Sequence, residues 1–198
     1  MVTSHIAKDI TMRVPAHRSF PITALLSFFL ILALGTSARV QAADLDLIAA
    51  GSLAVDKSLP VSQRDAQILA ARRYASFWNT GDAEFARQAL DPDFVDRTPP
   101  AGRLPGLPGV LAASTAFRSA VPDLRCEVTQ MIVAGDRVVS HLRFSGHFTG
   151  TLMGRQGQGQ PIQFIATDIY RVKNGRIVEN WHLEDNLSLL QQAGLVSQ

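Results

Sequence analysis

Hydrophobic positions follow two different periods along the chain, and the change between the periods divides the sequence. From Ser62 onward, apolar and aromatic residues recur at steps of three and four residues, which is typical of one face of an α-helix. Gly81 stands where this helix should end, and Asp82 can cap a short second helix over residues 83–90. The second half of the chain instead alternates between apolar and polar residues, which predicts β-strands.

The second half of the chain predicts a run of antiparallel strands. A third helix is expected before them and a last short helix after them, so the expected elements are a helix over 108–120, strands over 124–134, 137–146, 162–173 and 176–183, and a helix over 185–192. Helices followed by strands are typical of an α+β domain. We expect a cone-shaped curved antiparallel sheet, packed with about three N-terminal helices, that encloses a pocket.

One hairpin predicts which residues face this pocket. Asn174-Gly175 is a strong signal for a two-residue type I′ turn. The register that follows from this turn pairs Asp168 with Trp181 and Tyr170 with Glu179. Their shared face is mostly apolar and is therefore expected to point inward. A carboxylate on such a face is costly unless it is paired or protonated.

An apolar run near the N-terminus predicts a leader. Residues Ile22–Leu34 are nearly all apolar and follow basic residues, but the run is shorter than the ~20 residues that a membrane span needs. Its length and the small residues up to Ala42 are typical of a secretory signal peptide over residues 1–42, which starts at Met1 or at Met12. The mature protein is then expected in the periplasm or outside the cell, free of the membrane. The alternative is a retained N-terminal anchor.

The net charge of the chain changes sign when the leader is set aside. The formal net charge of the chain is +2, but residues 1–42 hold four basic residues and one acidic residue, so the remainder carries −1. No basic patch with interleaved aromatic residues remains, which argues against nucleic acid as a partner. The spacing of the histidines argues against a metal site, and the single Cys126 is expected to be a buried thiol. Residues 43–61 are interpreted as a flexible lead-in and residues 62–198 as the folded domain.

Short motifs in a fixed order carry a resemblance to a known family. They are FWNTGD at residues 77–82, VPDL at 121–124, AGDRV at 134–138, DIYRV at 168–172 and NGRIVENW at 174–181. Together they resemble the SnoaL-like polyketide cyclases over about residues 72–195. The resemblance implies the cone-shaped α+β fold of the nuclear-transport-factor-2-like superfamily, and it implies a homodimer or homotetramer.

The resemblance also implies a reaction. Family members close a ring by intramolecular aldol condensation of a polyketide ester, with no cofactor and no metal. Their acid/base is an Asp four residues after the Trp, which implies Asp185 in this sequence. A carboxyl group in an apolar pocket has a raised pKa and can exchange a proton near neutral pH. The alternative role for Asp185 is to cap the last helix.

Further residues are expected at the site. Arg97 and Phe148 stand where the family usually has His, so Arg97 is expected either to hold an anionic or carbonyl oxygen of a ligand or to pair with a carboxylate at the surface. His147 opens a loop near the expected pocket mouth and could polarise an oxygen. His182 and His141 are interpreted as sheet residues outside the site. The residues expected to bind substrate are Trp181, Tyr170, Asp168, Phe164, Trp78 and Tyr74.

Two functions follow from these observations. The first is an exported, cofactor-free acid/base enzyme of the cyclase, isomerase or lyase type that acts on a small hydrophobic carbonyl compound. The alternative is a periplasmic binding module that holds a hydrophobic small molecule without reacting it.

Overall fold

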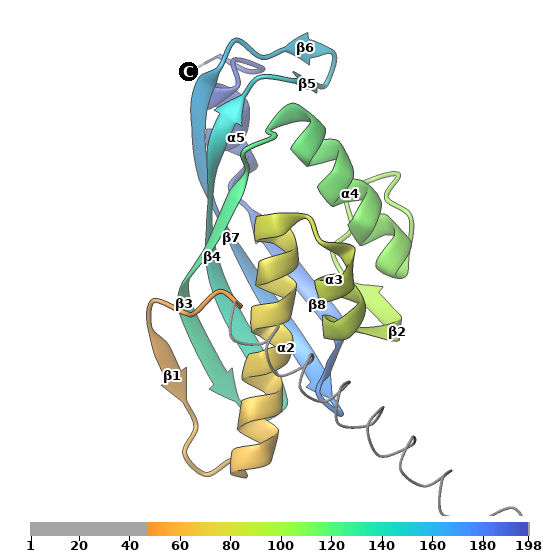
Figure 1. The fold of residues 1–198 in the computed structure, drawn as a ribbon, viewed down its shortest axis with the longest axis vertical. Helices are drawn as coiled ribbons and strands as arrows, with labels where there is room; N and C mark the ends of the chain where they lie inside the picture. The colour runs from red at the N-terminus through yellow and green to blue at the C-terminus, as the bar shows by residue number, and fades with distance from the viewer. Residues whose placement is uncertain (1–46, 198) are drawn as a thin grey trace, which may run out of the picture. The chain divides into compact units, whose positions relative to one another are not determined.

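The computed structural model describes residues 47–197, so the expected leader over residues 1–42 lies outside the described residues. Within the described range, four helices accompany a six-stranded mixed sheet and a small two-stranded one (Figure 1). The helices are α2 (Val61–Thr80), α3 (Ala83–Ala89), α4 (Gly106–Ala120) and α5 (Asn186–Gln192). In this range, none of them is both long and apolar enough to cross a membrane.

The main sheet has the strand order β1-β3-β4-β7-β8-β2. Its strands are β1 (Leu53–Val55), β2 (Leu90–Asp96), β3 (Arg125–Ala134), β4 (Arg137–Phe148), β7 (Gln160–Lys173) and β8 (Arg176–Glu184). The four central strands are antiparallel, as expected, whereas the edge strands β1 and β2 pair in parallel with β3 and β8. The expected α+β fold is confirmed.

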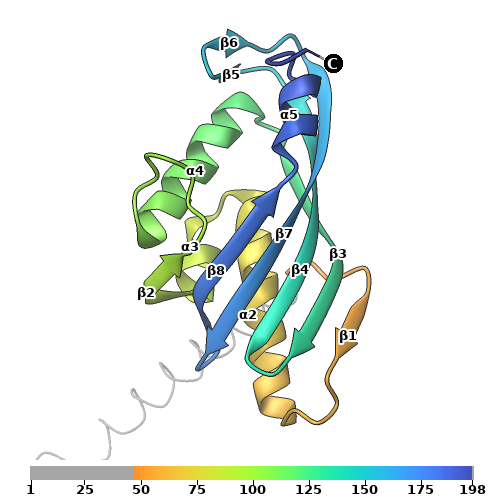
Figure 2. The ribbon, with the colours of Figure 1, turned by 180° about the vertical axis from the view of Figure 1, so that it is seen from behind.

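Helices α2, α3 and α4 lie on one side of the main sheet (Figure 1). Seen from behind, the middle of the sheet shows β8, β7, β4 and β3 side by side (Figure 2). The core lies between the helices and the inner sheet face, where α2 contributes Ala71, Tyr74 and Phe77. Cys126 on β3 belongs to this core as a free thiol, and burial raises its pKa. The prediction of a buried thiol is confirmed.

Local signals in the sequence set several element ends. Gly81 adopts the left-handed conformation with φ 78° and ends α2, and the Asp82 carboxylate accepts a hydrogen bond from the Glu84 backbone N–H at 2.9 Å and caps α3. Asn174 and Gly175 both have positive φ, as a type I′ turn requires. These ends were predicted because each depends on residues only a few positions apart.

The expected lead-in contains a β-strand. Leu53–Val55 form β1, which pairs with Met131–Val133 of β3. Upstream of this strand, the Arg72 guanidinium of α2 donates to the carbonyls of Leu47 and Ile48 at 2.6 and 2.8 Å. Part of the expected lead-in therefore forms an edge strand of the sheet, and the flexibility of residues 43–61 stays a prediction.

The register of the last hairpin differs from the predicted one. Lys173 pairs with Arg176, as expected, but the pairing then shifts by one residue between Val172 and Arg171, and Val178 is the extra residue on β8. Such a bulge moves every later side chain of the strand to the opposite face. Asp168 therefore pairs with His182 rather than with Trp181. By the same shift, Tyr170 pairs with Asn180 rather than with Glu179.

Candidate active site

A cavity of about 450 Å³ opens between the inner face of the sheet and the helices. Side chains from α2, α4, β2, β4, β7, β8 and α5 line it, together with the small hairpin of β5 (Thr151–Leu152) and β6 (Arg155–Gln156) and the loop before α4. Its lining residues are Tyr74, Trp78, Asp96, Arg103, Ala113, Ala116, Phe117, Phe144, Thr151, Leu152, Met153, Phe164, Asp168, Asn180, His182, Glu184, Asn186, Leu189 and Leu190.

One part of the cavity wall is a cluster of aromatic rings. Phe144 and Phe164 stack on neighbouring strands with their ring centroids 5.2 Å apart, and Phe117 of α4 meets Phe164 edge-on at 5.8 Å. Trp78 of α2 meets Phe144 edge-on at 6.3 Å. Rings packed in this way give a rigid apolar surface. This part of the cavity wall is therefore apolar.

The polar part of the cavity centres on Asp168, whose side chain is nearly fully buried. Its Oδ1 accepts hydrogen bonds from Asn180 Nδ2 at 2.7 Å and from His182 Nδ1 at 2.8 Å. Its Oδ2 accepts one from the Tyr170 hydroxyl at 3.0 Å. A carboxylate can be buried at a tolerable cost when donors surround it in this way. Asp168 therefore holds three side chains of the site in fixed positions.

His182 is the cation of this cluster at neutral pH. Burial alone would lower the pKa of His182, but the hydrogen bond to Asp168 and the nearby carboxylates of Asp168 and Glu184 outweigh burial and raise its pKa to about 10. Both ring nitrogens then carry protons and act as donors. Because Nδ1 donates to Asp168, Nε2 lies on the opposite side of the ring, 3.7 Å from Glu184 Oε2. This contact is too long for a good hydrogen bond, and both residues line the cavity.

The tyrosines of the site stay protonated. Burial, with the charge of Asp168 as the next cause, raises the pKa of Tyr170 well above its usual value, and the same two causes raise the pKa of Tyr74. Tyr170 therefore remains a hydrogen-bond donor to Asp168 across the physiological range. Tyr74 lines the cavity and meets the Tyr170 ring edge-on at 5.7 Å.

The comparison with known families decides what kind of domain this is. The profile of the SnoaL-like polyketide cyclases matches residues 68–193. The chain belongs to this family. None of the curated proteins compared with the chain matches it.

Solved structures of two candidate polyketide cyclases support this assignment, and a third structure shares the fold. A candidate polyketide cyclase from Bacillus cereus ATCC 10987 shares 37% identity, covers 77% of this chain and 96% of its own, and superposes with a TM-score of 0.70. IdmH, a candidate polyketide cyclase from Streptomyces antibioticus, shares 28% identity over 63% of this chain and 96% of its own, with a TM-score of 0.57. TsrD from Streptomyces laurentii, at 24% identity, covers 70% of this chain and 100% of its own, and its TM-score of 0.61 shows a common fold.

Asp185, the acid/base that the SnoaL-like resemblance implies, caps α5 in this structure. Its carboxylate accepts hydrogen bonds from the Ser188 backbone N–H at 3.1 Å and from the Ser188 hydroxyl at 2.6 Å. These bonds lower the pKa of Asp185, so the expected rise in its pKa is wrong. The neighbouring residues Glu184 and Asn186 line the cavity, whereas the Asp185 carboxylate is engaged with the helix.

Arg97 and Trp181 take up places outside the cavity lining. The Arg97 guanidinium binds the Glu179 carboxylate, which the Arg171 guanidinium also binds, and these bonds lower the pKa of Glu179 to about 2. The Trp181 ring lies beneath the Arg137 guanidinium at 5.5 Å. The bulge at Val178 explains both positions, because it turns the odd-numbered residues of β8 away from the cavity. Of the two roles expected for Arg97, the structure shows the pairing with a carboxylate.

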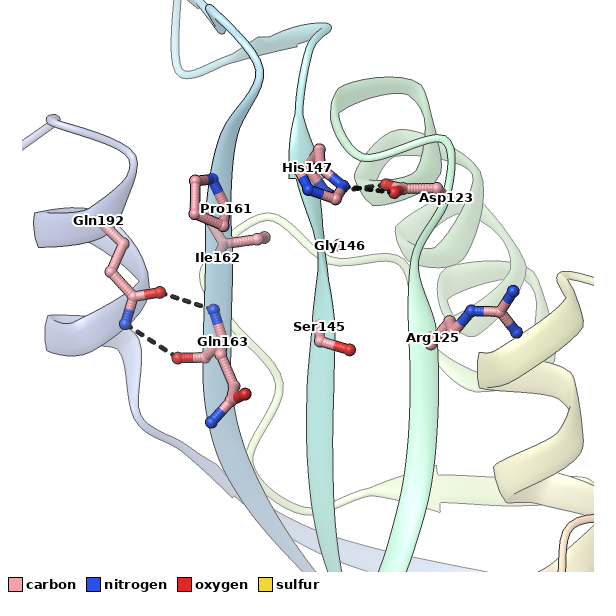
Figure 3. Close-up of a pocket in the computed structure, with 9 residues that line it drawn as sticks. All are labelled: Asp123, Arg125, Ser145, Gly146, His147, Pro161, Ile162, Gln163 and Gln192. Carbon is pink, nitrogen blue, oxygen red and sulfur yellow. Dashed lines mark hydrogen bonds and ion pairs between the residues drawn. The ribbon is translucent and has the colours of Figure 1, made fainter.

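His147 lies in a separate, open depression of about 600 Å³ that also includes Arg125 and Gln163. Figure 3 shows its ring turned toward Asp123, whose carboxylate accepts hydrogen bonds from the His147 backbone N–H at 2.8 Å and from the ring Nδ1 at 2.7 Å. Both side chains are more than half exposed. His147 therefore does not share a site with Asp168 in this structure.

The sequence predicted the cavity lining better than its reactive groups. Four of the six expected binding residues line the cavity, namely Tyr74, Trp78, Phe164 and Asp168. A fifth, Tyr170, supports Asp168 from the core. Sequence reasoning missed His182, Asn180 and Glu184 because the bulge is not signalled by residue type. It missed Arg103 because the loop before α4 has no periodicity.

Proposed function

We propose that this SnoaL-like protein is an exported acid/base enzyme that acts on a small hydrophobic carbonyl compound inside the cavity. The observation that carries the proposal is the position of His182, a protonated imidazole held by buried Asp168 beside the Glu184 carboxylate, at the polar end of an aromatic cavity. His182 can donate a hydrogen bond to a substrate oxygen, and Glu184 on the same strand can accept a proton from a substrate carbon.

The proposed reaction begins with a carbonyl oxygen placed against His182 Nε2. The Glu184 carboxylate takes a proton from the carbon next to the carbonyl. The electron pair of that C–H bond forms a carbon–carbon double bond, and the carbonyl electron pair moves onto the oxygen. The His182 imidazolium stabilises the negative charge on this oxygen at the polar end of the aromatic cavity.

The resulting enolate has two outcomes that need no cofactor. Attack of its carbon on a second carbonyl carbon of the same molecule forms a carbon–carbon bond and closes a ring, and Glu184 returns its proton to the new alkoxide. In a substrate with a carbon–carbon double bond between its β- and γ-carbons, return of the proton to the γ-carbon moves the double bond next to the carbonyl and isomerises the compound. Membership in the SnoaL-like polyketide cyclase family favours ring closure.

Exchange of the α-protons of carbonyl compounds with solvent deuterium tests the proposed chemistry. NMR spectroscopy should show that the protein accelerates exchange in small aromatic ketones and 1,3-diketones. His182→Gln should lower the rate by about 10²-fold or more, a typical contribution of one such group. His141→Gln is the matched control, because His141 contacts Thr167 and does not line the cavity. A ligand that binds and is recovered with all its protons would support the binding module instead.

The pH profile of exchange gives a second readout. The imidazolium of His182 is present below its pKa of about 10 and is lost above it. After the hydroxide-catalysed background rate is subtracted, the exchange rate due to the protein should therefore fall as the pH rises through about 10. A rate that rises through this range would show that neutral His182, or another base, carries the reaction.

A further inference from the structure

Arg103 is a cation in the cavity wall that the proposed proton transfer does not use. It belongs to the loop between β2 and α4, and its side chain is 23% exposed. Its Nη1 lies 3.3 Å from Asp96 Oδ2, the one polar contact of this guanidinium with residues 47–197. Nε and Nη2 therefore have no partner among the described residues, and neither belongs to the fully buried unpaired atoms, so both are open to solvent or to a ligand.

Two other half-buried arginines differ from Arg103 because they donate to backbone carbonyls, although Nε of Arg118 is also buried without a partner. The guanidinium of Arg72 donates through Nε and Nη2 to two backbone carbonyls of the segment before β1. That of Arg118 donates through Nη2 to the carbonyls of Trp78 and Leu124. Both are anchored to the backbone and serve the fold. Arg103 has no such backbone acceptor for its guanidinium, and it faces the cavity instead.

The geometry of Arg103 indicates the kind of group that would complete its hydrogen bonding. Nε and Nη2 form one edge of the planar guanidinium, and this edge matches the two oxygens of a carboxylate. Asp96, whose side chain is 10% exposed, holds the guanidinium from Nη1 and leaves this edge free. Asp96 is itself oriented by the backbone N–H of Thr98, which donates to Oδ1 at 3.0 Å.

We infer that the substrate of this cavity carries a carboxylate that binds the free edge of Arg103, in addition to the carbonyl group that reacts at His182. This inference deepens the proposed function and rests on it for the identity of the reacting group. It narrows the substrate class from hydrophobic carbonyl compounds to aromatic or polyketide-like keto acids. Arg103 is the specificity-determining residue in this account, and His182 and Glu184 perform the chemistry.

The experiment compares one keto acid with its ester. The probes are 4-oxo-4-phenylbutanoate and its methyl ester, whose binding is measured by calorimetry and by the fluorescence of Trp78, which lines the cavity. The wild-type protein should bind the acid at least about tenfold more tightly than the ester, as expected for a charge-assisted pair. Arg103→Gln should remove this preference, and Arg97→Gln, which changes an arginine outside the cavity, should keep it.

A second variant controls for misfolding of Arg103→Gln. Arg103→Gln leaves the Asp96 carboxylate without its cation, so the double variant Asp96→Asn with Arg103→Gln removes both charges and should show the same loss of preference. The inference is overturned if the wild-type protein binds the ester as tightly as the acid, if it binds neither, or if the folded double variant retains the preference. If the protein prefers the acid but does not exchange α-protons, the assignment of Arg103 as the carboxylate site stands. That result would refute only the proposed reaction.

Discussion

At the scale of single residues, Asp168 connects the packing of the sheet to the chemistry of the site. Its carboxylate is only 1% exposed, and its two oxygens accept hydrogen bonds from Tyr170, Asn180 and His182. Each donor comes from the inner face of β7 or β8, so the hairpin and the buried carboxylate depend on each other. A change in any donor should therefore affect both folding stability and the position of His182.

Tyr170→Phe isolates the stability contribution of one donor. The ring stays in the core, but Asp168 Oδ2 loses the hydroxyl that donates to it at 3.0 Å. We expect the free energy of unfolding to fall by about 1–2 kcal/mol, since a buried acceptor is left without its partner. Urea denaturation followed by circular dichroism measures this change. An unchanged free energy of unfolding would show that the hydroxyl is not a structural donor.

The pKa of His182 predicts how stability depends on pH. In the folded protein its pKa is raised to about 10 from a usual value of 6.5. The ionised pair with Asp168 therefore contributes fully below about pH 6.5, and its contribution is lost as the pH rises through about 10. The difference in unfolding free energy between the wild-type protein and His182→Gln should shrink over this range. A difference that grows with pH would contradict the raised pKa.

Residue types alone predicted part of this cluster. The inward positions of Asp168 and Tyr170 follow from the alternation along residues 162–173, and both are confirmed. His182 was expected outside the site because a single His carries no spacing signal. The free edge of Arg103 depends on a loop conformation and on Asp96, and no local pattern encodes either of them.

At the scale of elements, the register of β8 determines which polar side chains line the cavity. The turn at Asn174-Gly175 sets its start, and the bulge at Val178 then reverses the faces. The reversal brings Asn180, His182 and Glu184 to the cavity and leaves Glu179 to pair with two arginines. Residues 176–184 contain no glycine or proline that would indicate a bulge, so its position follows from long-range packing rather than from local sequence.

Deletion of Val178 tests the role of the bulge. Without the extra residue, continuous pairing from the turn would place Glu179 and Trp181 on the inner face and His182 on the outer one. We expect a loss of several kcal/mol in the free energy of unfolding, because the Asp168 cluster and the Glu179 pairs are both broken. Val178→Ala keeps the register and should cost much less. Equal thermal unfolding of the two variants would show that the register does not depend on the bulge.

At the scale of the whole molecule, the sequence predicted the order of helices and central strands but not how the edge strands of the sheet pair. Helices followed by antiparallel strands, with the SnoaL-like motifs in order, indicated the fold that the structure shows. The parallel pairing of the edge strands β1 and β2 was not predicted, because the partners of Leu53–Val55 and Leu90–Asp96 lie far away in the sequence. The expected homodimer or homotetramer stays a prediction.

Export is a further prediction at this scale. The apolar run Ile22–Leu34 and the small residues before Ala42 predict that the leader is removed when the full chain is produced in a secreting bacterial cell. N-terminal sequencing and intact mass of the protein recovered from the periplasm or the medium should show a chain that begins at Ala43. Recovery of the uncleaved chain in the membrane fraction would indicate a retained anchor.

The central claim is that His182, held by Asp168, stabilises the negative charge that forms in the SnoaL-like cavity, and that Asp185 serves as a helix cap. The most direct measurement compares the rate of α-proton exchange in His182→Gln and Asp185→Asn, each corrected for the fraction of folded protein. We predict a loss of about 10²-fold or more for His182→Gln and a rate within about threefold of the wild-type value for Asp185→Asn. The reverse ranking, with exchange abolished in a folded Asp185→Asn variant and retained in His182→Gln, would contradict the claim.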